Sequence, residues 1–264
     1  MPKMNGDENL RPQDADDGIP VTVETEEAPR AMPAMASAAM PPLLFMLAIY
    51  AADVVGRACG ADASVMRAFV RLAATAVLAL AYRRGRLRET VLLRCRAADG
   101  VRAVLIGAFM QVSLACIVSL FAGGGDIAVG VRLDLSDAAV IASMAVSVLL
   151  TPLCEEAIFR ALAYTRLRAC TSSWVAAVVS SLLFALVHPS VTSAAAAFIA
   201  GMVLAFLYER SASLAVCVIA HASFNALSYF IGFAPGVSLP VRIAAVAVSA
   251  AMVVLASAGI KKAN

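Results

Sequence analysis

The chain has 264 residues, of which 62% are hydrophobic and only 15% are charged. Soluble globular domains are usually about 45–50% apolar, so this composition excludes an ordinary soluble protein and predicts a polytopic membrane protein. The formal net charge of +3 comes from basic loops, which favours contact with anionic lipid and indicates no nucleic-acid partner.

The first 37 residues form an acidic, proline-containing leader, which we expect to be a disordered tail. This leader lacks the basic start and short apolar stretch of a cleavable signal peptide, so the first membrane span is expected to act as the insertion signal. Residues 38–264 are expected to form one all-helical transmembrane domain, with its motif core at residues 137–232.

Eight membrane spans are expected in this domain. A hydrocarbon core about 30 Å thick needs roughly 20 helical residues at about 1.5 Å each, and the breakers His188-Pro189-Ser190 and Gly236 to Pro240 punctuate two double-length apolar windows. The second span fits least well, because Arg67 and Arg71 lie in its first turns. The predicted fold is an all-α membrane helix bundle with spans near residues 38–56, 65–82, 103–122, 137–154, 173–188, 192–208, 213–232 and 240–259.

The basic residues predict how this bundle is oriented. Seven arginines gather around the connection between the second and third spans: Arg83, Arg84, Arg86, Arg88, Arg94, Arg96 and Arg102. Basic loops remain in the cytoplasm, and eight spans then place both termini there. The same side receives Arg166, Arg168, Arg210, Lys261 and Lys262. We therefore expect an integral membrane protein, and its compact loops and Ala/Arg-rich usage indicate a bacterial cell membrane.

Few ionisable residues lie in the spans of the C-terminal half: Glu155, Glu156, Arg160, His188 and His221. Each costs at least about 2.5–3.5 kcal/mol on insertion scales, so such residues are functional candidates. Glu156 and Arg160 are four residues apart on one helix face and can neutralise each other. Glu155 is rotated by about 100° from Glu156, so it is expected to face a cavity instead.

Helix lengths predict that the histidines lie at the depth of Glu155. A turn at residues 170–173 lies midway between Glu155 and His188, and a hairpin bent there has two arms of about 21 Å each. His221 and Asn225 are four residues apart on a later span, with His221 about 13 Å from its start. Three separate segments are therefore expected to converge at one depth.

These polar residues have a structural and a chemical interpretation. An intramembrane histidine or asparagine can hydrogen-bond neighbouring helices, and Glu156 with Arg160 is expected to be structural. The set Glu155, His188, His221 and Asn225 at one depth is harder to explain by packing. Together these groups suit amide hydrolysis, which needs a base for water, a proton carrier and donors to a developing oxyanion.

Three short motifs carry a family resemblance: EEAIFR at 155–160 fits EExxxR, FALVH at 184–188 fits FxxxH, and HASFN at 221–225 fits HxxxN. In this order they resemble the CPBP intramembrane proteases, also called the Abi or CAAX-protease-and-bacteriocin-processing family. The resemblance implies eight transmembrane helices around a catalytic cavity. It implies that water is activated by Glu155 and His188, that the oxyanion is stabilised by His221 and Asn225, and that Arg160 supports the motif helix through Glu156.

The resemblance leaves the cofactor open between none and Zn²⁺. A zinc ion would use carboxylate and imidazole ligands, here Glu155, His188 and His221, and the HExxH motif is absent. The implied partners are membrane lipid and a peptide or protein substrate. Eukaryotic members trim prenylated CaaX termini, whereas many bacterial relatives are linked to bacteriocin processing or self-immunity.

The leading hypothesis is an intramembrane endopeptidase that hydrolyses a peptide bond of a membrane-associated, prenylated or peptide substrate. An alternative is a non-catalytic membrane immunity protein or scaffold that binds a peptide or partner helix with the same pocket. A small secondary transporter is a further alternative, because buried Glu and His also relay protons. Transporters often contain internal repeats with broken helices in corresponding positions, and the sequence shows no such repeat.

Overall fold

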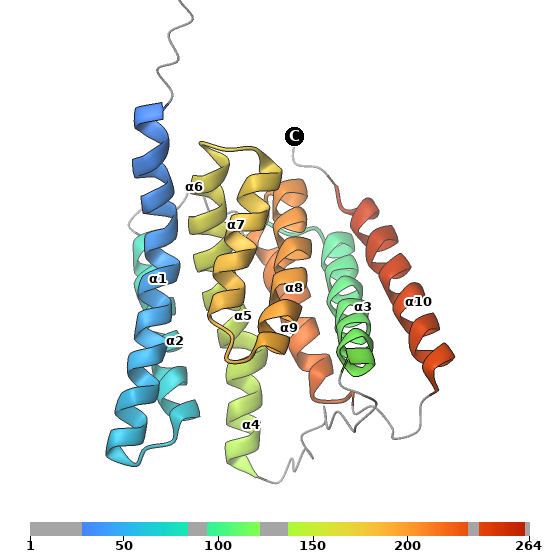
Figure 1. Ribbon diagram of the computed structural model, residues 1–264, viewed down its shortest axis with the longest axis horizontal. Coiled ribbons are helices and arrows are strands. Elements are labelled where there is room, and N and C mark those ends of the chain that lie inside the picture. The colour runs from blue at the N-terminus through green and yellow to red at the C-terminus, as the bar shows by residue number, and fades with distance from the viewer. Residues whose placement is uncertain (1–27, 84–93, 122–136, 232–237, 262–264) are drawn as a thin grey trace, which may run out of the picture.

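The computed structural model describes residues 28–83, 94–121, 137–231 and 238–261 (Figure 1). Every regular element in these ranges is a helix, so the predicted all-helical fold is confirmed. Residues 1–27 of the expected tail and residues 84–93 of the arginine-rich connection lie outside the described residues.

Each of the eight expected spans overlaps a helix. The helices are α1 (Ala28–Cys59), α2 (Ala63–Arg83), α3 (Ala97–Phe121), α4 (Ala138–Ala145), η1 (Val146–Leu150), α5 (Thr151–Glu156), η2 (Ala157–Tyr164), α6 (Thr165–Arg168), α7 (Ser173–Leu186), α8 (Val191–Ser211), α9 (Leu214–Ser228) and α10 (Leu239–Gly259). The elements α4, η1, α5, η2 and α6 follow one another without a break and form one continuous rod, in which η1 and η2 are π-helical.

Five helical stretches in the described part of the chain are long and apolar enough to cross a membrane: Met35–Cys59, Ala97–Ser119, Ala138–Arg168, Val191–Ser211 and Leu239–Gly259. Two further apolar helices, α7 and α9, are shorter, with 14 and 15 residues. These helices form a polytopic membrane bundle, as the composition predicts. The side of the membrane on which the termini lie stays a prediction.

Two boundaries differ from the prediction by ten residues or more. The first helix begins at Ala28, so residues 28–37 of the expected tail are helical. The fourth span does not end at residue 154 but continues to Arg168, which makes it 31 residues long. Between these points the chain has no turn-forming residue, and the two glutamates find partners inside the bundle, so nothing stops the helix before the turn at residues 170–173.

The α7–α8 connection shows that His188-Pro189 lies between two helices and does not kink a single one. The α7 helix ends at Leu186, and Pro189 precedes a new helix instead of kinking the old one. Ser190 caps α8, because its hydroxyl accepts from the Ser193 N–H while the Ser193 hydroxyl accepts from the Ser190 N–H. The hairpin of the rod and α7 is therefore followed directly by α8.

The α9 helix lies inside the bundle and contacts α3, η1, α5 and α8. The contact with α3 is close at Gly107, where a Cβ atom would overlap the carbonyl oxygen of Ala220 and lie 2.9 Å from the Phe224 nitrogen. Only glycine allows this approach, because the obstructing atoms belong to the backbone of α9. Gly107 thus determines where α9 can sit.

Polar contacts join three helix ends at one end of the bundle, where the α6–α7 turn also lies (Figure 1). Glu209 accepts hydrogen bonds from Tyr164 at 2.7 Å and Arg168 at 3.1 Å. Arg210 donates to the carbonyl oxygens of Ala258 and Ile260 at 2.8 and 2.7 Å. The basic residues at the ends of α6 and α8 therefore share one side, as the orientation argument requires.

Candidate active site

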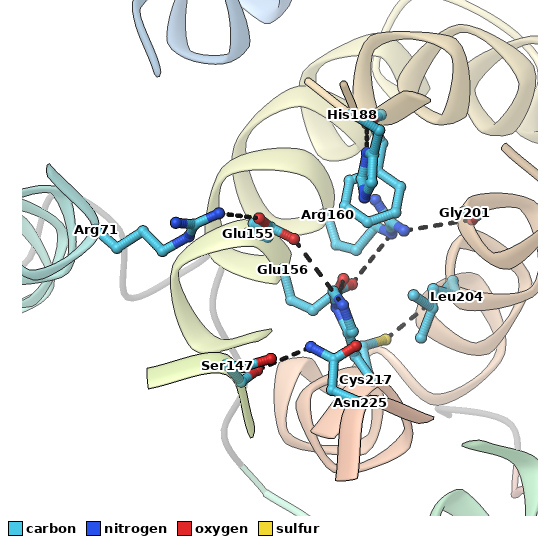
Figure 2. A network of polar contacts seen from close by, with 12 residues as sticks. Arg71, Ser147, Glu155, Glu156, Arg160, His188, Gly201, Leu204, Cys217 and Asn225 are labelled. Carbon is cyan, nitrogen blue, oxygen red and sulfur yellow. Dashed lines mark hydrogen bonds and ion pairs between the residues drawn. The ribbon is translucent and has the colours of Figure 1, made fainter. Parts of the chain in front are cut away.

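Three helical segments bring the motif residues together. Glu155 and Glu156 end α5, Arg160 follows one turn later in η2, and His221 lies in α9. All four are buried: their exposed fractions are 4% for Glu155, 0% for Glu156 and Arg160, and 6% for His221. Figure 2 shows Arg71 reaching toward Glu155 on one side of the cluster and Asn225 beside Ser147 on another. The predicted convergence of the first and third motifs is therefore present.

Glu156 is held from two sides. Its Oε2 atom lies 3.2 Å from Arg160 Nε, which forms the expected ion pair within the rod. Its Oε1 atom lies 2.9 Å from His221 Nδ1 in α9. Arg160 also approaches the Gly201 carbonyl at 3.5 Å, and its guanidinium carbon lies 4.9 Å from the centre of the Phe184 ring. The Glu156–Arg160 pair thus ties the rod to α7, α8 and α9.

His221 lies between the two glutamates. Because the Glu156 carboxylate accepts a hydrogen bond from Nδ1, the Nδ1 atom carries a proton and the opposite nitrogen, Nε2, points toward Glu155. The separation between His221 Nε2 and Glu155 Oε2 is 3.9 Å, which is too long for a direct hydrogen bond. One water molecule can hydrogen-bond both atoms across a gap of this size.

Glu155 has a partner that the sequence analysis did not assign. Arg71 Nη2, from α2, lies 3.6 Å from Glu155 Oε1, so the expectation that Glu155 has no ion-pair partner is wrong, whereas its access to a cavity stays a prediction. The physical reason is that a buried carboxylate needs a counter-charge, and α2 supplies one. The sequence contains a signal for this contact: Arg71 lies inside the second expected span, and an arginine in a membrane span needs an acidic partner. The prediction treated Arg71 only as a charge that weakens this span.

His188 has a defined ring orientation. Its Nδ1 lies 2.9 Å from the Phe184 carbonyl oxygen, which can only accept, so Nδ1 donates and Nε2 is left as the acceptor. The Phe184 ring contacts both histidines edge to face, with centroid distances of 5.0 Å to His188 and 5.8 Å to His221. No hydrogen bond or ion pair among the described residues joins His188 to Glu155, so their joint action on water stays a prediction.

Phe184 is the first residue of the FxxxH motif, and the sequence analysis gave it no role. The side chain is 2% exposed and packs edge to face on Phe159, with centroids 5.2 Å apart. Its ring also lies beneath the Arg160 guanidinium, a favourable cation–π arrangement. The aromatic ring therefore separates the two histidines and holds the arginine of the first motif.

Asn225 binds the rod. Its Nδ2 atom donates to the Ser147 carbonyl oxygen at 2.8 Å. In η1 the Thr151 N–H donates to the carbonyl oxygen of Val146, five residues earlier. In the same register, the carbonyl oxygen of Ser147 would accept from the N–H of residue 152. Residue 152 is proline and has no N–H, so Asn225 satisfies the carbonyl that Pro152 leaves free. The predicted oxyanion role of Asn225 therefore relies on its second amide hydrogen.

The possible zinc ligands do not form a metal site in this arrangement. Within the described ranges, no three His, Cys, Asp or Glu side chains are grouped closely enough to hold a metal ion. Each histidine holds Nδ1 on an acceptor, Glu156 for His221 and the Phe184 carbonyl for His188, which leaves Nε2 as the ring nitrogen for a further ligand. In this arrangement, however, Glu155, His188 and His221 are not grouped closely enough to share one metal ion.

A pocket of about 740 Å³ adjoins the cluster. One wall is the face of α2 that carries Arg67 and Arg71, and the other wall is formed by α4, η1 and Thr151 of α5, with Tyr229 also lining it. The remaining lining is mostly apolar. Arg71 lines the pocket and its guanidinium contacts Glu155, so Arg71 lies between the pocket and the buried carboxylate.

The fold and the cluster define a helical membrane protein with a buried glutamate–histidine site. Residues 137–227 match the family described as Rce1-like, type II CAAX prenyl endopeptidase Rce1-like. The matched segment is therefore Rce1-like, and the resemblance to the CAAX-type intramembrane proteases is confirmed. The matched segment runs from the start of the rod to α9 and contains all seven residues that define the three motifs. No curated protein and no solved structure gives a match.

Proposed function

We propose that the protein is an intramembrane endopeptidase of the CAAX type that hydrolyses a peptide bond near the carboxyl terminus of a prenylated or other membrane-associated peptide. The single observation that carries this function is the opposition of Glu155 and His221 across 3.9 Å in a buried cluster. The Rce1-like match over the same helices supports the substrate class.

In the proposed reaction, Glu155 and His221 Nε2 hold one water molecule. Glu155 takes a proton from the water as its oxygen bonds to the peptide carbonyl carbon, which is general base catalysis. The Glu156 carboxylate keeps the His221 ring in place through Nδ1, so Nε2 faces the reacting atoms. Burial keeps other water away and strengthens each electrostatic contact.

The tetrahedral intermediate then loses its amine. We assign the oxyanion to the second amide hydrogen of Asn225, while His221 Nε2, which carries no proton, remains a hydrogen-bond acceptor. The carbon–nitrogen bond breaks as the leaving nitrogen receives a proton from Glu155, directly or through His188. The support for His188 is its locked ring, which presents Nε2 while Nδ1 is held by the Phe184 carbonyl.

The test uses purified full-length protein in lipid nanodiscs and a peptide that ends in S-farnesylcysteine followed by three apolar residues. Glu155→Gln and His188→Ala are each expected to lower the rate of tripeptide release, followed by mass spectrometry, by at least about 100-fold. Glu209→Gln is the matched control, because Glu209 contacts Tyr164 and Arg168 at the end of the bundle. This variant should keep the wild-type rate.

Two results would overturn the assignment. Turnover by Glu155→Gln at the wild-type rate per folded molecule would remove Glu155 from the reaction. Peptide binding by wild-type protein without any cleavage would instead favour a non-catalytic binding function. Glu156→Gln is expected to lower the yield of folded protein more than the turnover of each folded molecule, because Glu156 joins the rod to α9.

A further inference from the structure

Arg71 differs from the other arginine of the same pocket. Arg67, one turn earlier on α2, donates to Asp53 at 2.6 Å and has a fully formed ion pair. Arg71 Nη2 lies 3.6 Å from Glu155 Oε1, beyond hydrogen-bond length, and its buried Nε atom has no hydrogen-bond partner. Arg71 is therefore incompletely bonded where the pocket meets the catalytic cluster.

The chemistry of arginine indicates what could complete this bonding. A guanidinium presents its N–H groups in a planar fork that fits the two oxygens of a carboxylate, and charge-assisted bonds of this kind are strong. Glu155 uses only one oxygen on Arg71 and directs its other oxygen at His221. A second carboxylate entering from the pocket can therefore offer Arg71 a better partner than Glu155 does.

We propose, on the basis of the peptidase function above, that the pocket between α2 and the α4–η1 wall holds the carboxyl-terminal end of the substrate. Arg71 then exchanges Glu155 for the terminal carboxylate of the peptide. The volume of about 740 Å³ lies within the usual range for small-ligand sites, so it suits a short peptide end. The mostly apolar walls suit apolar side chains next to that carboxylate.

This exchange couples substrate binding to activation of the base. While Arg71 contacts Glu155, part of the charge of the carboxylate is neutralised and one oxygen is occupied. When Arg71 moves to the substrate, Glu155 keeps only the water and His221 as neighbours of its oxygens. Because an extended residue spans about 3.3–3.6 Å, a carboxylate at Arg71 places the cleaved bond within a few residues of the chain end.

The experiment compares two forms of the same farnesylated peptide, one with a free carboxyl terminus and one with a terminal amide. For wild-type protein in nanodiscs, the free acid should have a kcat/KM at least about 10-fold higher than the amide. For Arg71→Gln the two forms should react equally. The ratio is measured within one protein sample, so a lower folded fraction does not change it.

Arg67→Gln is the matched control, because it removes a guanidinium from the same helix and pocket whose partner is already Asp53. It should keep the preference for the free acid, and Arg71→Lys should keep part of it through its charge. Equal reaction of acid and amide in the wild type, or an unchanged preference in Arg71→Gln, would overturn the proposal.

Binding separates this proposal from the peptidase function. Fluorescence anisotropy of the labelled peptides on Glu155→Gln protein should still show tighter binding of the acid, and the double variant with Arg71→Gln should lose this preference. If wild-type protein cleaves neither peptide but binds the acid through Arg71, the peptidase function fails and the subsite stands. If both peptides are cleaved equally, the subsite fails and the peptidase function stands.

Tryptophan substitutions that fill the pocket test whether the peptide binds there. Ala142 lines the wall formed by α4, whereas Ile141 beside it is exposed and does not line the pocket. Ala142→Trp should raise KM for the free acid about 10-fold or more, and Ile141→Trp should leave it unchanged. Equal KM values for the two tryptophan variants would place the substrate elsewhere.

Discussion

The two adjacent glutamates of α5 have different surroundings. Glu156 is fully buried, and both of its oxygens lie within 3.2 Å of a positively charged or donating nitrogen. Glu155 makes only longer contacts, 3.6 Å to Arg71 and 3.9 Å to His221, and its arginine borders a pocket. The difference indicates that one carboxylate holds helices together while its neighbour can change partners.

The same contrast applies to their arginines. Arg160 follows Glu156 in the same rod and is fully buried, so it pairs without any movement of helices. Arg71 comes from α2, and its side chain is 19% exposed. In the proposed subsite the contact between α2 and α5 is exchanged for a substrate, whereas the Glu156–Arg160 contact within the buried rod is kept. The predictions below test this division, from the largest expected effect to the smallest.

Breaking the Glu156–Arg160 pair should have the largest effect. Arg160→Met leaves Glu156 charged and buried with His221 alone, and removing one member of a buried pair costs about 3–5 kcal/mol. Arg168→Met is the matched control, because it breaks an exposed pair between an arginine of the same rod and Glu209 of α8 and should cost about 0–1 kcal/mol. Unfolding free energies in mixed micelles measure both.

The double variant Arg160→Met/Glu156→Gln distinguishes charge from packing. It should recover most of the stability lost in Arg160→Met, because no uncompensated charge remains. If the double variant is as unstable as Arg160→Met, the loss comes from packing around Phe184 and Gly201 and the fixed role of Glu156 is not electrostatic.

Displacing α9 should have an intermediate effect. At Gly107 of α3 an added methyl group meets the backbone of α9, which cannot rotate away, so Gly107→Ala should cost about 1–3 kcal/mol. It should also lower peptide cleavage, because α9 carries His221. Circular dichroism melting in detergent and tripeptide release measure the two effects.

Gly100→Ala is the control for helix propensity on the same helix. A methyl group there meets only the side chains of Cys95 and Ile219 at 3.6 and 3.9 Å, which are ordinary contacts. Replacing glycine by alanine within a helix should then stabilise the protein by up to about 1 kcal/mol. Equal effects of the two substitutions would mean that α3 and α9 do not approach as closely as Gly107 indicates.

The predictable parts of the site are those that depend on local spacing. Apolar length and the breakers at residues 188–190 predicted the helices, and the four-residue spacing predicted the Glu156–Arg160 pair. Helix lengths also predicted that Glu155 of α5 and His221 of α9 lie at a similar depth in the membrane. It could not identify lateral neighbours, because helices at equal depth can lie on any side of one another. The contact between Arg71 and Glu155 therefore required the structure.

One unpredicted contact had a local signal that was not used. A proline inside a helical stretch always leaves a carbonyl without its usual donor, so Pro152 indicated that some side chain must supply one. The sequence does not say which side chain, because Asn225 is 73 residues further along the chain from Pro152. Packing of α9 against η1 decides the partner.

The smallest expected effect, a coupling of about 1 kcal/mol between two substitutions, tests the link between Pro152 and Asn225. Asn225→Ala leaves the Ser147 carbonyl without its donor and should cost about 1–3 kcal/mol in a wild-type background. In a Pro152→Ala background, residue 152 regains an N–H that can donate to the Ser147 carbonyl oxygen, so Asn225→Ala should cost about 1 kcal/mol less.

Ser228→Ala is the control, because the Ser228 hydroxyl donates to the Asn225 carbonyl oxygen and does not contact Ser147. This substitution should show no coupling to Pro152→Ala. Additive unfolding free energies for Asn225→Ala and Pro152→Ala would mean that Asn225 does not replace the missing donor, since two residues that serve the same carbonyl should couple in such a cycle.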